Sequence, residues 1–583
     1  MPLFVGYGIM EKMATVQGGD VMRKAMPIGV EDFCELRKGY YFVDKTRFIR
    51  QLLDEHSKVT LLTRPRRFGK TLTMSMLDWF FSIDKVDKSC ELFAGLDIER
   101  AGASYMGERG QYPVVFLTFK DTNGLSWETM QGLFASYISM LLLRYTYLLD
   151  SPRVQEPLKK RFQQLVDMEA DEARLSAAVV LLMEMLHQHY GRQVILLIDE
   201  YDAPVQQAWE NGFYHECIAF LKQLLGSALK SNDNLAFAVL TGVLRVAKES
   251  IFSDLNNLDV CSVLSTRYDD IIGFTPEEVT RMAHDLGRED RLPEIRKWYD
   301  GYRFGEAEIY NPWSVLNFFR NDCFDDYWVN TSGNGILRAL LEKADTQRIE
   351  TLQTLLDGGT IQVTLNERVI YEDIGRDKSA LYTILLLTGY LTTASINAAR
   401  RNRYALRIPN KEIRDIYATE ILNHLAQGLD TDTFDDLFDY LLHGDGRNFA
   451  SQLQKILLGI ISTYDAANKE SFYHGFMLGL STLLLGSEYW VESNRESGYG
   501  RFDLAIFPED PQKSGVILEF KATANEAELE GKAKEALAQI EDRHYDTEFK
   551  KRGIHNVWKY GIAFCGKRVY VAMAKQDKQA TTK

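Results

Sequence analysis

Cysteine is scarce in this sequence, and its placement excludes a disulfide framework. The six cysteines are scattered along 583 residues, and none belongs to a CxxC pair or to a cluster of cysteine and histidine. A zinc site or a disulfide scaffold requires such paired spacings. We therefore expect a reduced protein of the cytoplasm whose fold depends on hydrophobic cores.

Long apolar runs are also missing. A membrane-spanning helix needs about 18 consecutive apolar residues, whereas the two most apolar segments, 380–396 and 475–491, are interrupted by Thr, Ser and Gly. The start of the chain, MPLFVGYGIMEK, lacks the basic residues that open a signal peptide. We expect no membrane association, a disordered leader over residues 1–25 and a tail over residues 576–583.

An excess of positive charge is absent as well. Lys and Arg number 68 against 82 Asp and Glu, which gives a net charge of −14. This balance excludes a passive nucleic-acid coat, because phosphate binding depends on positive charge. It does not exclude an enzyme, because metal sites need carboxylates and a basic groove can be local.

One local basic run consists of Arg400, Arg401, Arg403, Arg407, Lys411 and Arg414. A solvated loop and helix face is the alternative interpretation of that run.

Short apolar segments alternate with helical patterns in the first half of the chain. The expected strands are Val59–Thr63, Val114–Phe119, Val194–Ile198 and Leu235–Leu240. Helical periodicity lies between them, for example over residues 173–190 and 216–229. Strands of this kind, separated by helices, predict an α/β fold in which a parallel sheet is covered on both faces. We expect this nucleotide-binding core to occupy residues 26–275.

The second half of the chain is expected to hold two further regions. Residues 276–430 have mainly helical patterns and are interpreted as a lid or linker. Residues 431–575 combine helices with strand signals at 488–493, 502–507 and 516–522. We expect this last region to form a small α/β domain.

A candidate phosphate-binding loop follows the first predicted strand, in the sequence T-R-P-R-R-F-G-K-T that begins at Thr63. A strand, a loop, Gly-Lys-Thr and a helix in this order direct backbone N–H groups at phosphates. Lys70 is expected to reach the β- and γ-phosphates of ATP, and the Thr71 hydroxyl to bind Mg²⁺. The usual pattern has glycine where this chain has Arg64. The expected nucleotide contacts of the segment are Arg66, Arg67, Phe68, Gly69, Lys70, Thr71 and Leu72.

Paired acids follow the third predicted strand, in a Walker B pattern. Asp199 is expected to hold Mg²⁺, and Glu200 to polarise the attacking water. A solvent-exposed acidic strand end is the alternative interpretation of these two acids.

Thr241, at the tip of the fourth predicted strand, is a candidate sensor of the γ-phosphate, with Arg245 or Lys248 as a charge sensor. Surface salt bridges are the alternative for these last three residues.

A carboxylate hairpin is the second candidate site. The segments GRFDLAIF and GVILEFKA flank the turn PEDPQKS, and a hairpin centred on this turn pairs Ala505 with Ile517 and Asp503 with Glu519. Side chains alternate along strands, so Asp503, Glu519 and Lys521 share one face. Two carboxylates in register repel each other unless a divalent cation lies between them. Lys521 would then orient water or stabilise charge on a phosphate, with Mg²⁺ as the metal and Mn²⁺ as the alternative. The opposite face is expected to be the core face and carries Phe502, Leu504, Ile506, Val516, Leu518 and Phe520.

Residues from about Met26 to Ser332 resemble the AAA-ATPase-like domain found in many bacterial proteins. The motifs that carry the resemblance are PIGVEDF, YYFVDKT, LLTRPRRFGKTLTMSML, LLIDEYDAP, GVLRVAKESIFSDLNNL, GFTPEEV, WYDGYRFG and YNPWSVLNF. RPRRFGKT, without the first glycine, is similar to that family's own form of the loop. The resemblance therefore implies a P-loop ATPase whose nucleotide site is intact despite Arg64.

Residues from about Thr388 onward resemble the PD-(D/E)XK nuclease domain that is usually fused to such ATPases. The matching segments are LTGYLT, RIPNKEIR, YHGFMLGL, SNRESGYGRFDLAI, ILEFK and ALAQIEDRHY. The resemblance implies a restriction-endonuclease-like fold with Asp503, Glu519 and Lys521 as the nuclease core.

Three further residues take roles from the same resemblance. It suggests His474 as a further metal ligand, for which a satisfied helix histidine is the alternative. It also suggests Gln539 and Tyr545 as residues that help to hold the substrate, although their spacing of Q-x5-Y differs from the commoner Q-x3-Y.

Three functions are consistent with the sequence. The first is an ATP-regulated, metal-dependent nuclease acting on DNA, and analogy with other ATPase–nuclease fusions extends it to defence against foreign DNA. The second is a nucleotide-dependent switch that holds DNA without cutting it. The third is an ATPase scaffold whose main partner is another protein. A homo-oligomer is among the expected assemblies, because neighbouring subunits often complete such ATPase sites.

Overall fold

The computed structural model describes most of the chain between residues 24 and 575. The described residues are 24–89, 91–120, 122–245, 257–328, 337, 351–352, 354–356, 358–367, 378–396, 402–425, 432–460, 470–481, 484, 488–493, 496–497 and 500–575. The predictions for the leader up to residue 23, the tail from residue 576, Lys248, Arg400 and Arg401 lie outside the described residues.

A parallel five-stranded sheet forms the centre of the N-terminal half. Its strand order is β2-β3-β4-β1-β5, and every neighbouring pair is parallel. The strands are β1 (Val59–Thr63), β2 (Val114–Thr118), β3 (Val194–Asp199), β4 (Leu235–Gly242) and β5 (Leu258–Cys261). The four predicted strands are confirmed, and every residue of β1 and β3 is buried, as a sheet covered on both faces requires.

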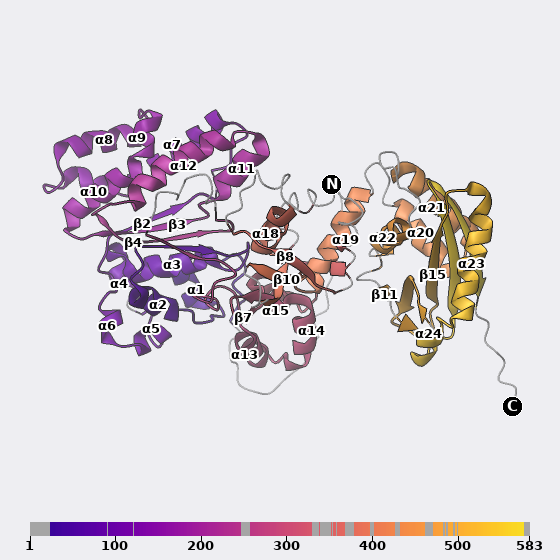
Figure 1. The fold of residues 1–583 in the computed structure, drawn as a ribbon. Helices are drawn as coiled ribbons and strands as arrows, with labels where there is room; N and C mark the ends of the chain where they lie inside the picture. The colour runs from indigo at the N-terminus through magenta and orange to yellow at the C-terminus, as the bar shows by residue number, and fades with distance from the viewer. Residues whose placement is uncertain are drawn as a thin grey trace, which may run out of the picture.

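Helices cover both faces of this sheet. Figure 1 shows α1 to α6 on one side of the strands and α7 to α12 on the other. The longer ones are α2 (Arg47–Glu55), α3 (Lys70–Phe81), α7 (Trp127–Leu143), α8 (Glu156–Val166), α10 (Ala178–Tyr190), α11 (Ala203–Asn211) and α12 (Tyr214–Leu229), and α1 (Phe33–Gly39) is shorter. The single helix expected over residues 173–190 is instead α9 (Glu172–Ser176) followed by α10, with Ala177 serving as the cap of both.

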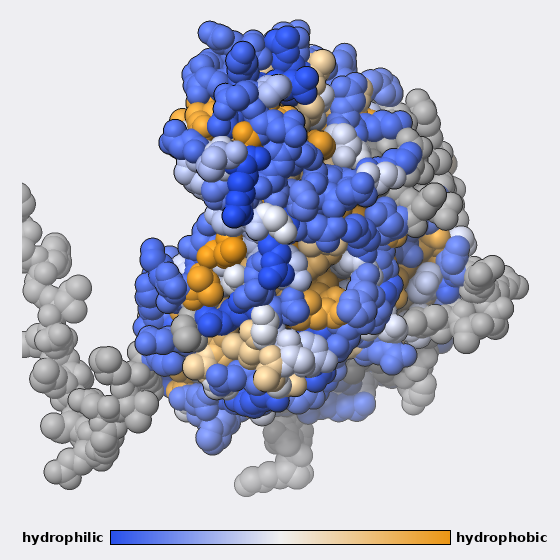
Figure 2. Space-filling view, turned by 90° about the vertical axis from the view of Figure 1, so that its left-hand side faces the viewer, coloured by the Kyte–Doolittle hydropathy of each residue, from blue (hydrophilic) through white to orange (hydrophobic). Residues whose placement is uncertain are grey.

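The outer surface of this half is largely hydrophilic, with separate hydrophobic patches (Figure 2). Among the helices that the structure describes, none is both long and apolar enough to cross a membrane.

The middle region packs on the nucleotide-binding sheet. It contains α13 (Pro276–Leu286), α14 (Leu292–Tyr299), the hairpin β6 (Tyr302–Phe304) and β7 (Ala307–Ile309), α15 (Pro312–Asn321), α18 (Lys378–Thr388), α19 (Lys411–Leu425) and a three-stranded sheet of β8 (Ile361–Thr364), β10 (Arg403–Arg407) and β9 (Thr392–Ile396). Tyr302, Phe304, Trp328, Tyr390 and Tyr417 belong to the same hydrophobic cluster as β1, β3 and β4. The middle region therefore shares its core with the sheet that carries the first candidate site.

A second, mixed sheet forms the C-terminal domain. Its order is β11-β14-β15-β16-β17, with β15 and β16 parallel and the other pairs antiparallel. The strands are β11 (Tyr489–Ser493), β14 (Leu504–Pro508), β15 (Gly515–Ala522), β16 (Val557–Cys565) and β17 (Arg568–Lys575). The accompanying helices are α20 (Asp432–His443), α21 (Gly446–Ile460), α22 (Glu470–Ser481), α23 (Leu529–Asp542) and α24 (Thr547–Lys551). The α/β class predicted for both halves is confirmed.

The hairpin of β14 and β15 has the predicted register but not the predicted single core face. Ala505 pairs with Ile517, as expected. Leu504 and Leu518 pack with α20 to α22, whereas Ala505 and Ile517 pack under α23 and α24. Phe502 lies in this second cluster and not beside Leu504, because β14 begins only at Leu504 and the alternation does not extend back to it.

Candidate active sites

The RPRRFG loop, residues 64–69, connects β1 to α3 at the carboxyl edge of the parallel sheet. Gly69 precedes the first residue of α3 and has a φ of 96°, a conformation that glycine adopts without strain. The Lys70 ammonium donates to the carbonyl oxygens of Arg64 (3.1 Å) and Pro65 (2.9 Å), and so closes the loop on itself. Burial is the main cause that lowers the pKa of Lys70, while Glu200 and Asp199 oppose this shift. The loop thus folds around the Lys70 ammonium at the start of α3, where the sequence predicts a phosphate site.

Arg64, which replaces the first glycine of the usual pattern, is a structural residue. Its guanidinium is fully buried and donates to the carbonyl oxygens of Thr63, Cys261 and Tyr268, each at 2.9 Å. It also lies over the Phe304 ring, 5.0 Å from its centroid. These contacts hold the loop to the end of β5 and direct the long side chain into the core. The loop therefore tolerates a large residue at this position.

The other side chains of the loop contact the middle region. Phe68 meets the rings of Tyr302 and Phe304 at centroid distances of 5.0 and 5.3 Å. The Arg67 guanidinium lies 4.2 Å from the centroid of Trp313. The indole N–H of Trp328 donates to the Arg66 carbonyl oxygen at 3.2 Å. The motifs WYDGYRFG and YNPWSVLNF thus supply the surface on which the loop rests.

Asp199 lies between two hydroxyl groups at the carboxyl ends of the strands. Thr71 donates to one of its carboxylate oxygens at 2.7 Å, and Thr241 donates to the other in a short hydrogen bond. Because β4 lies between β1 and β3, its last residues place Thr241 directly beside Asp199. Hydroxyl and carboxylate oxygens are the donors that Mg²⁺ prefers, so this pair of residues fits the expected metal.

The acids that follow Asp199 lie in two different environments. Glu200 has a φ of 52°, and burial is the main cause that raises its pKa, opposed by Lys70. Asp202 is buried and accepts hydrogen bonds from the backbone N–H groups of Val243 (2.9 Å) and Leu244 (2.8 Å). Glu200 lines the cavity beside the loop, whereas Asp202 fixes the chain that leaves β4.

A cavity of about 440 Å³ adjoins the loop. The predicted contacts from Arg66 to Leu72 line it, and so does Glu200. Thr241 reaches the site through Asp199, whereas Arg245 is half-buried and is not among the described residues that line this cavity.

The C-terminal site is built at the open end of the β14–β15 hairpin. Oδ2 of the Asp503 side chain accepts a hydrogen bond from the Phe520 backbone N–H of β15 at 2.7 Å, which holds this carboxylate against the strand. Burial is the main cause that raises the pKa of Asp503, while this hydrogen bond, His474 and Lys521 lower it. Glu519 is 2% exposed, and the Lys521 ammonium lies 3.8 Å from its Oε1. The structure therefore brings the three predicted core residues together.

Helix α23 contributes a side chain that contacts the Glu519 carboxylate. The Gln539 amide donates to Oε1 of Glu519 in a short hydrogen bond and to the Tyr545 hydroxyl at 3.3 Å. Gly561, opposite Glu519 on β16, allows this approach, because a Cβ atom there would lie 2.2 Å from the Ala533 carbonyl oxygen of α23. Gln539 and Tyr545 thus lie at the carboxylates despite their longer spacing.

His474 reaches the same site from α22. Its Nε2 lies 2.8 Å from the Asp503 backbone oxygen, which fixes the ring against the residue that precedes β14. Within the described residues, no group of three or more His, Cys, Asp or Glu side chains is arranged to hold a metal ion. The carboxylates of Asp503 and Glu519 are hard oxygen donors that suit Mg²⁺ or Mn²⁺, and further ligands would come from water or phosphate.

Comparison with known proteins finds one matching family model in each half of the chain. Residues 27–252 match the family model described as a predicted AAA-ATPase, and residues 468–573 match that of the PD-(D/E)XK nuclease superfamily. The chain carries an AAA-ATPase-like domain and a PD-(D/E)XK nuclease superfamily domain. Both resemblances predicted from the sequence are confirmed.

One relative aligns with almost the whole chain. It is an uncharacterized protein in the vnfD 5′ region of Azotobacter chroococcum mcd 1, and it is 27% identical over 546 residues, or 91% of this chain and 95% of the relative. The alignment is too long to omit either domain or the middle region.

Several residues in the two domains and the middle region were missed by sequence reasoning. Asp202 stands in the DEYDAP motif, and its position beside a predicted site was a usable signal. Gly561 and Trp328 gave no such signal, because their roles depend on α23 and on the RPRRFG loop, which are distant in sequence. Glu412 of α19 is also fully buried and accepts from the Trp328 backbone N–H at 2.9 Å.

Proposed function

We propose that this protein is an ATPase whose nucleotide state controls a metal-dependent nuclease that acts on DNA in the cytoplasm. The observation that carries the proposal is that one chain holds two pairs of the predicted site residues in contact: Thr71 with Asp199 at 2.7 Å, and Lys521 with Glu519 at 3.8 Å. Defence against foreign DNA stays a prediction from analogy.

At the first site, the chain's own residues would bind and orient ATP. Lys70, which now donates to two loop carbonyl oxygens, would transfer these hydrogen bonds to the β- and γ-phosphates. Glu200 would hold the water that attacks the γ-phosphate, and Thr241 would keep Asp199 in place. Mg²⁺ bound at Thr71 and Asp199 would neutralise charge on the phosphates.

At the second site, the residues would act on a phosphodiester bond. Lys521, 3.8 Å from Oε1 of Glu519, would orient the attacking water or stabilise the charge that develops on the phosphate oxygens. Gln539 keeps the Glu519 carboxylate in position. A divalent cation at Asp503 and Glu519 would activate the water and polarise the phosphate.

A continuous set of contacts supports coupling between the two sites. Trp328 donates from its indole to the Arg66 carbonyl oxygen and from its backbone to Glu412. Glu412 lies on α19, which packs against α22, and α22 carries His474 against the Asp503 backbone. Figure 1 shows α19 between the ATPase half and α22. A shift of the RPRRFG loop on nucleotide binding would therefore displace elements that reach the nuclease site.

Incubation of the full chain with linear, circular and single-stranded DNA and with RNA tests the nuclease. Each substrate is combined with Mg²⁺ or Mn²⁺ and compared with chelated controls. We expect metal-dependent cleavage of DNA that Lys521→Ala abolishes. Lys513→Ala is the matched control, because Lys513 lies in the turn of the same hairpin and pairs with Glu488.

Two other results would change the assignment. Equal cleavage by wild type and Lys521→Ala would reject the PD-(D/E)XK site as its source. Intact ATP hydrolysis with no cleavage of any substrate would favour the nucleotide-dependent clamp or the scaffold.

A further inference from the structure

Helix α7 exposes apolar side chains on the outside of the ATPase half. Met140 and Leu143, near its C-terminal end, are 66% and 53% exposed. Leu125, just before the helix, is 82% exposed, and Tyr147, just after it, is 37% exposed. Large apolar side chains that gather along one element, instead of being scattered singly over the surface, indicate an interaction site.

The exposed face of α7 is also free of charge. The segment from residue 129 to residue 143 contains no charged residue. Its exposed positions Thr129, Gly132, Ser136, Met140 and Leu143 follow one another at steps of three or four residues, so they share one face of the helix. A Cβ atom at Gly132 would meet no other atom within 4 Å, so the helix is open to an approaching element there. Such a face loses few contacts with water when another surface covers it.

The order of residues along this face has a two-fold symmetry about Ser136. Gly132 and Met140 lie four residues on either side of it, and Thr129 and Leu143 lie seven. When two copies of α7 run antiparallel and cross at Ser136, Met140 of each copy lies at the level of Gly132 of the other. The long side chain therefore meets a position that has no side chain to displace, as close helix packing requires.

Opposite charges flank the uncharged face. Glu128 and Arg144 are both exposed, and each lies eight residues from Ser136. An antiparallel pair brings Glu128 of each copy to the level of Arg144 of the other, whereas a parallel pair in register would bring like charges together. The charges therefore favour the antiparallel, two-fold arrangement.

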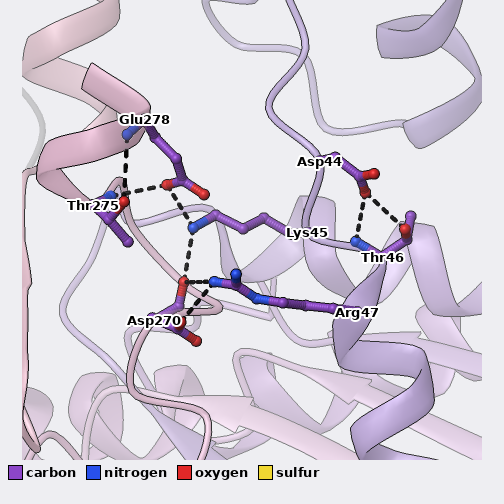
Figure 3. A network of polar contacts seen from close by, with 7 residues as sticks. All are labelled: Asp44, Lys45, Thr46, Arg47, Asp270, Thr275 and Glu278. Atoms are coloured by element: carbon purple, nitrogen blue, oxygen red, sulfur yellow. Dashed lines mark hydrogen bonds and ion pairs between the residues drawn. The ribbon is translucent and has the colours of Figure 1, made fainter. Parts of the chain in front are cut away.

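The middle region contacts the opposite side of the ATPase sheet and leaves α7 accessible. Figure 1 shows α7 and α13 on opposite sides of β1 to β4. The polar network in Figure 3 holds α13 to the segment that leads into α2: Lys45 donates to Oε2 of Glu278 and to the Asp270 carbonyl oxygen, each at 2.7 Å. Arg47 also pairs with the Asp270 carboxylate at 2.7 Å. Docking of the middle region through these contacts does not cover the face of α7.

We propose that α7 is a contact between two copies of this chain, paired antiparallel about a two-fold axis near Ser136. The contact is isologous, so it closes as a dimer and does not extend into a ring or filament. The helix has 17 residues and is about 25 Å long, so the contact is smaller than a standard protein interface. A dissociation constant on the order of 10 µM is expected for a contact of this size.

Sedimentation velocity of the full chain between about 1 and about 100 µM tests the dimer. We expect wild type to shift from monomer to dimer over this range. Met140→Glu places a charge in the contact and is expected to weaken the dimer at least about tenfold. Leu458→Glu is the matched control, because Leu458 is 54% exposed on α21 of the C-terminal domain, and this variant should dimerise as wild type does.

A cross-link tests the position of the axis. Ser136→Cys is expected to give a covalent dimer on oxidation, because the axis brings the two introduced thiols together. In Thr129→Cys the two thiols would lie about 20 Å apart along the helices, so this variant should not cross-link through its new thiol. Cys323, which is exposed, is present in both variants and in wild type, so its contribution cancels.

Three results would overturn the proposal. Wild type that stays a monomer at all concentrations would rule out the dimer. A dimer that Met140→Glu leaves as stable as wild type would rule out the α7 face as the contact. Equal cross-linking of Ser136→Cys and Thr129→Cys would rule out the axis at Ser136.

Discussion

At the scale of single residues, Arg64 gives the sharpest test of how the RPRRFG loop is built. Arg64→Gly restores the usual pattern but leaves three buried carbonyl oxygens without their donor. We expect a loss of about 3 kcal/mol in stability, seen as a lower temperature of the first thermal transition. Arg67→Gly is the control, because its φ of 69° suits glycine and it is less buried. Tighter ATP binding by Arg64→Gly without thermal loss would contradict this account.

At the nuclease site, the substitution of Gln539 gives the sharpest test at the scale of a single residue. Gln539→Ala removes the donor to Glu519, and we expect cleavage to fall by about 10- to 100-fold with a higher requirement for Mg²⁺. Lys534→Ala changes an exposed residue of the same helix that pairs with Glu530, and it should leave the rate unchanged. A metal titration of cleavage measures both variants. An unaltered Mg²⁺ requirement in Gln539→Ala would argue against a role for Gln539 at the carboxylates.

The sequence was sufficient for residues whose role follows from the strand that carries them. Asp199 and Thr241 lie at the carboxyl ends of neighbouring parallel strands, and Asp503 and Glu519 lie at the open end of a hairpin, so strand period and register predicted where these residues lie. The role of Arg64 could not be predicted, because its acceptors on Cys261 and Tyr268 are distant in sequence.

At the scale of elements, helix α19 carries a buried acid that predicts a pH dependence. Glu412 accepts from the Ser314 hydroxyl at 2.8 and 2.9 Å and from the Trp328 N–H, yet burial raises its pKa from 4.5 to about 8. The folded state therefore holds a proton that the unfolded state releases between these values. The contribution of Glu412 to the free energy of unfolding is fully present below pH 4.5 and falls as the pH rises toward 8.

The variant Glu412→Gln isolates this effect. Gln keeps the shape and cannot ionise, so its thermal stability should equal that of wild type near pH 5. At pH 8.5 we expect the variant to be the more stable of the two, by an amount on the order of a few kcal/mol. Scanning calorimetry at the two pH values measures the difference. A difference that is the same at both values would contradict a neutral Glu412.

The elements that the sequence did not predict are those whose form depends on packing. Strand period predicted β1 to β4 and the register of β14 with β15, but not that α23 and α24 bury the second face of that hairpin. Hydrophobic periodicity likewise ran through α9 and α10 without showing the break at Ala177. The aromatic residues of the middle region were visible in the sequence, but their contact with the RPRRFG loop depends on tertiary structure.

At the scale of the whole molecule, the middle region joins the two sites. Trp328→Phe keeps an aromatic ring but removes the indole donor to the Arg66 carbonyl oxygen and part of the buried ring system. We expect ATP hydrolysis within about twofold of wild type and a reduced effect of ATP on cleavage, because coupling energies of this kind are about 1–3 kcal/mol. Trp79→Phe removes an indole bond to Asp32 in the same domain and should preserve the ATP effect. Loss of the ATP effect in both variants would show that Trp328 has no special part in coupling.

The central claim is that one chain holds an ATPase site and a separate nuclease site that responds to it. The most direct measurement follows ATP hydrolysis and DNA cleavage together on the same preparations of wild type, Lys70→Ala and Lys521→Ala, with and without ATP. The account predicts that Lys521→Ala hydrolyses ATP without cleaving DNA, and that ATP changes the cleavage rate of wild type but not of Lys70→Ala. Cleavage that persists in Lys521→Ala, or that responds to ATP equally in Lys70→Ala and wild type, would contradict it.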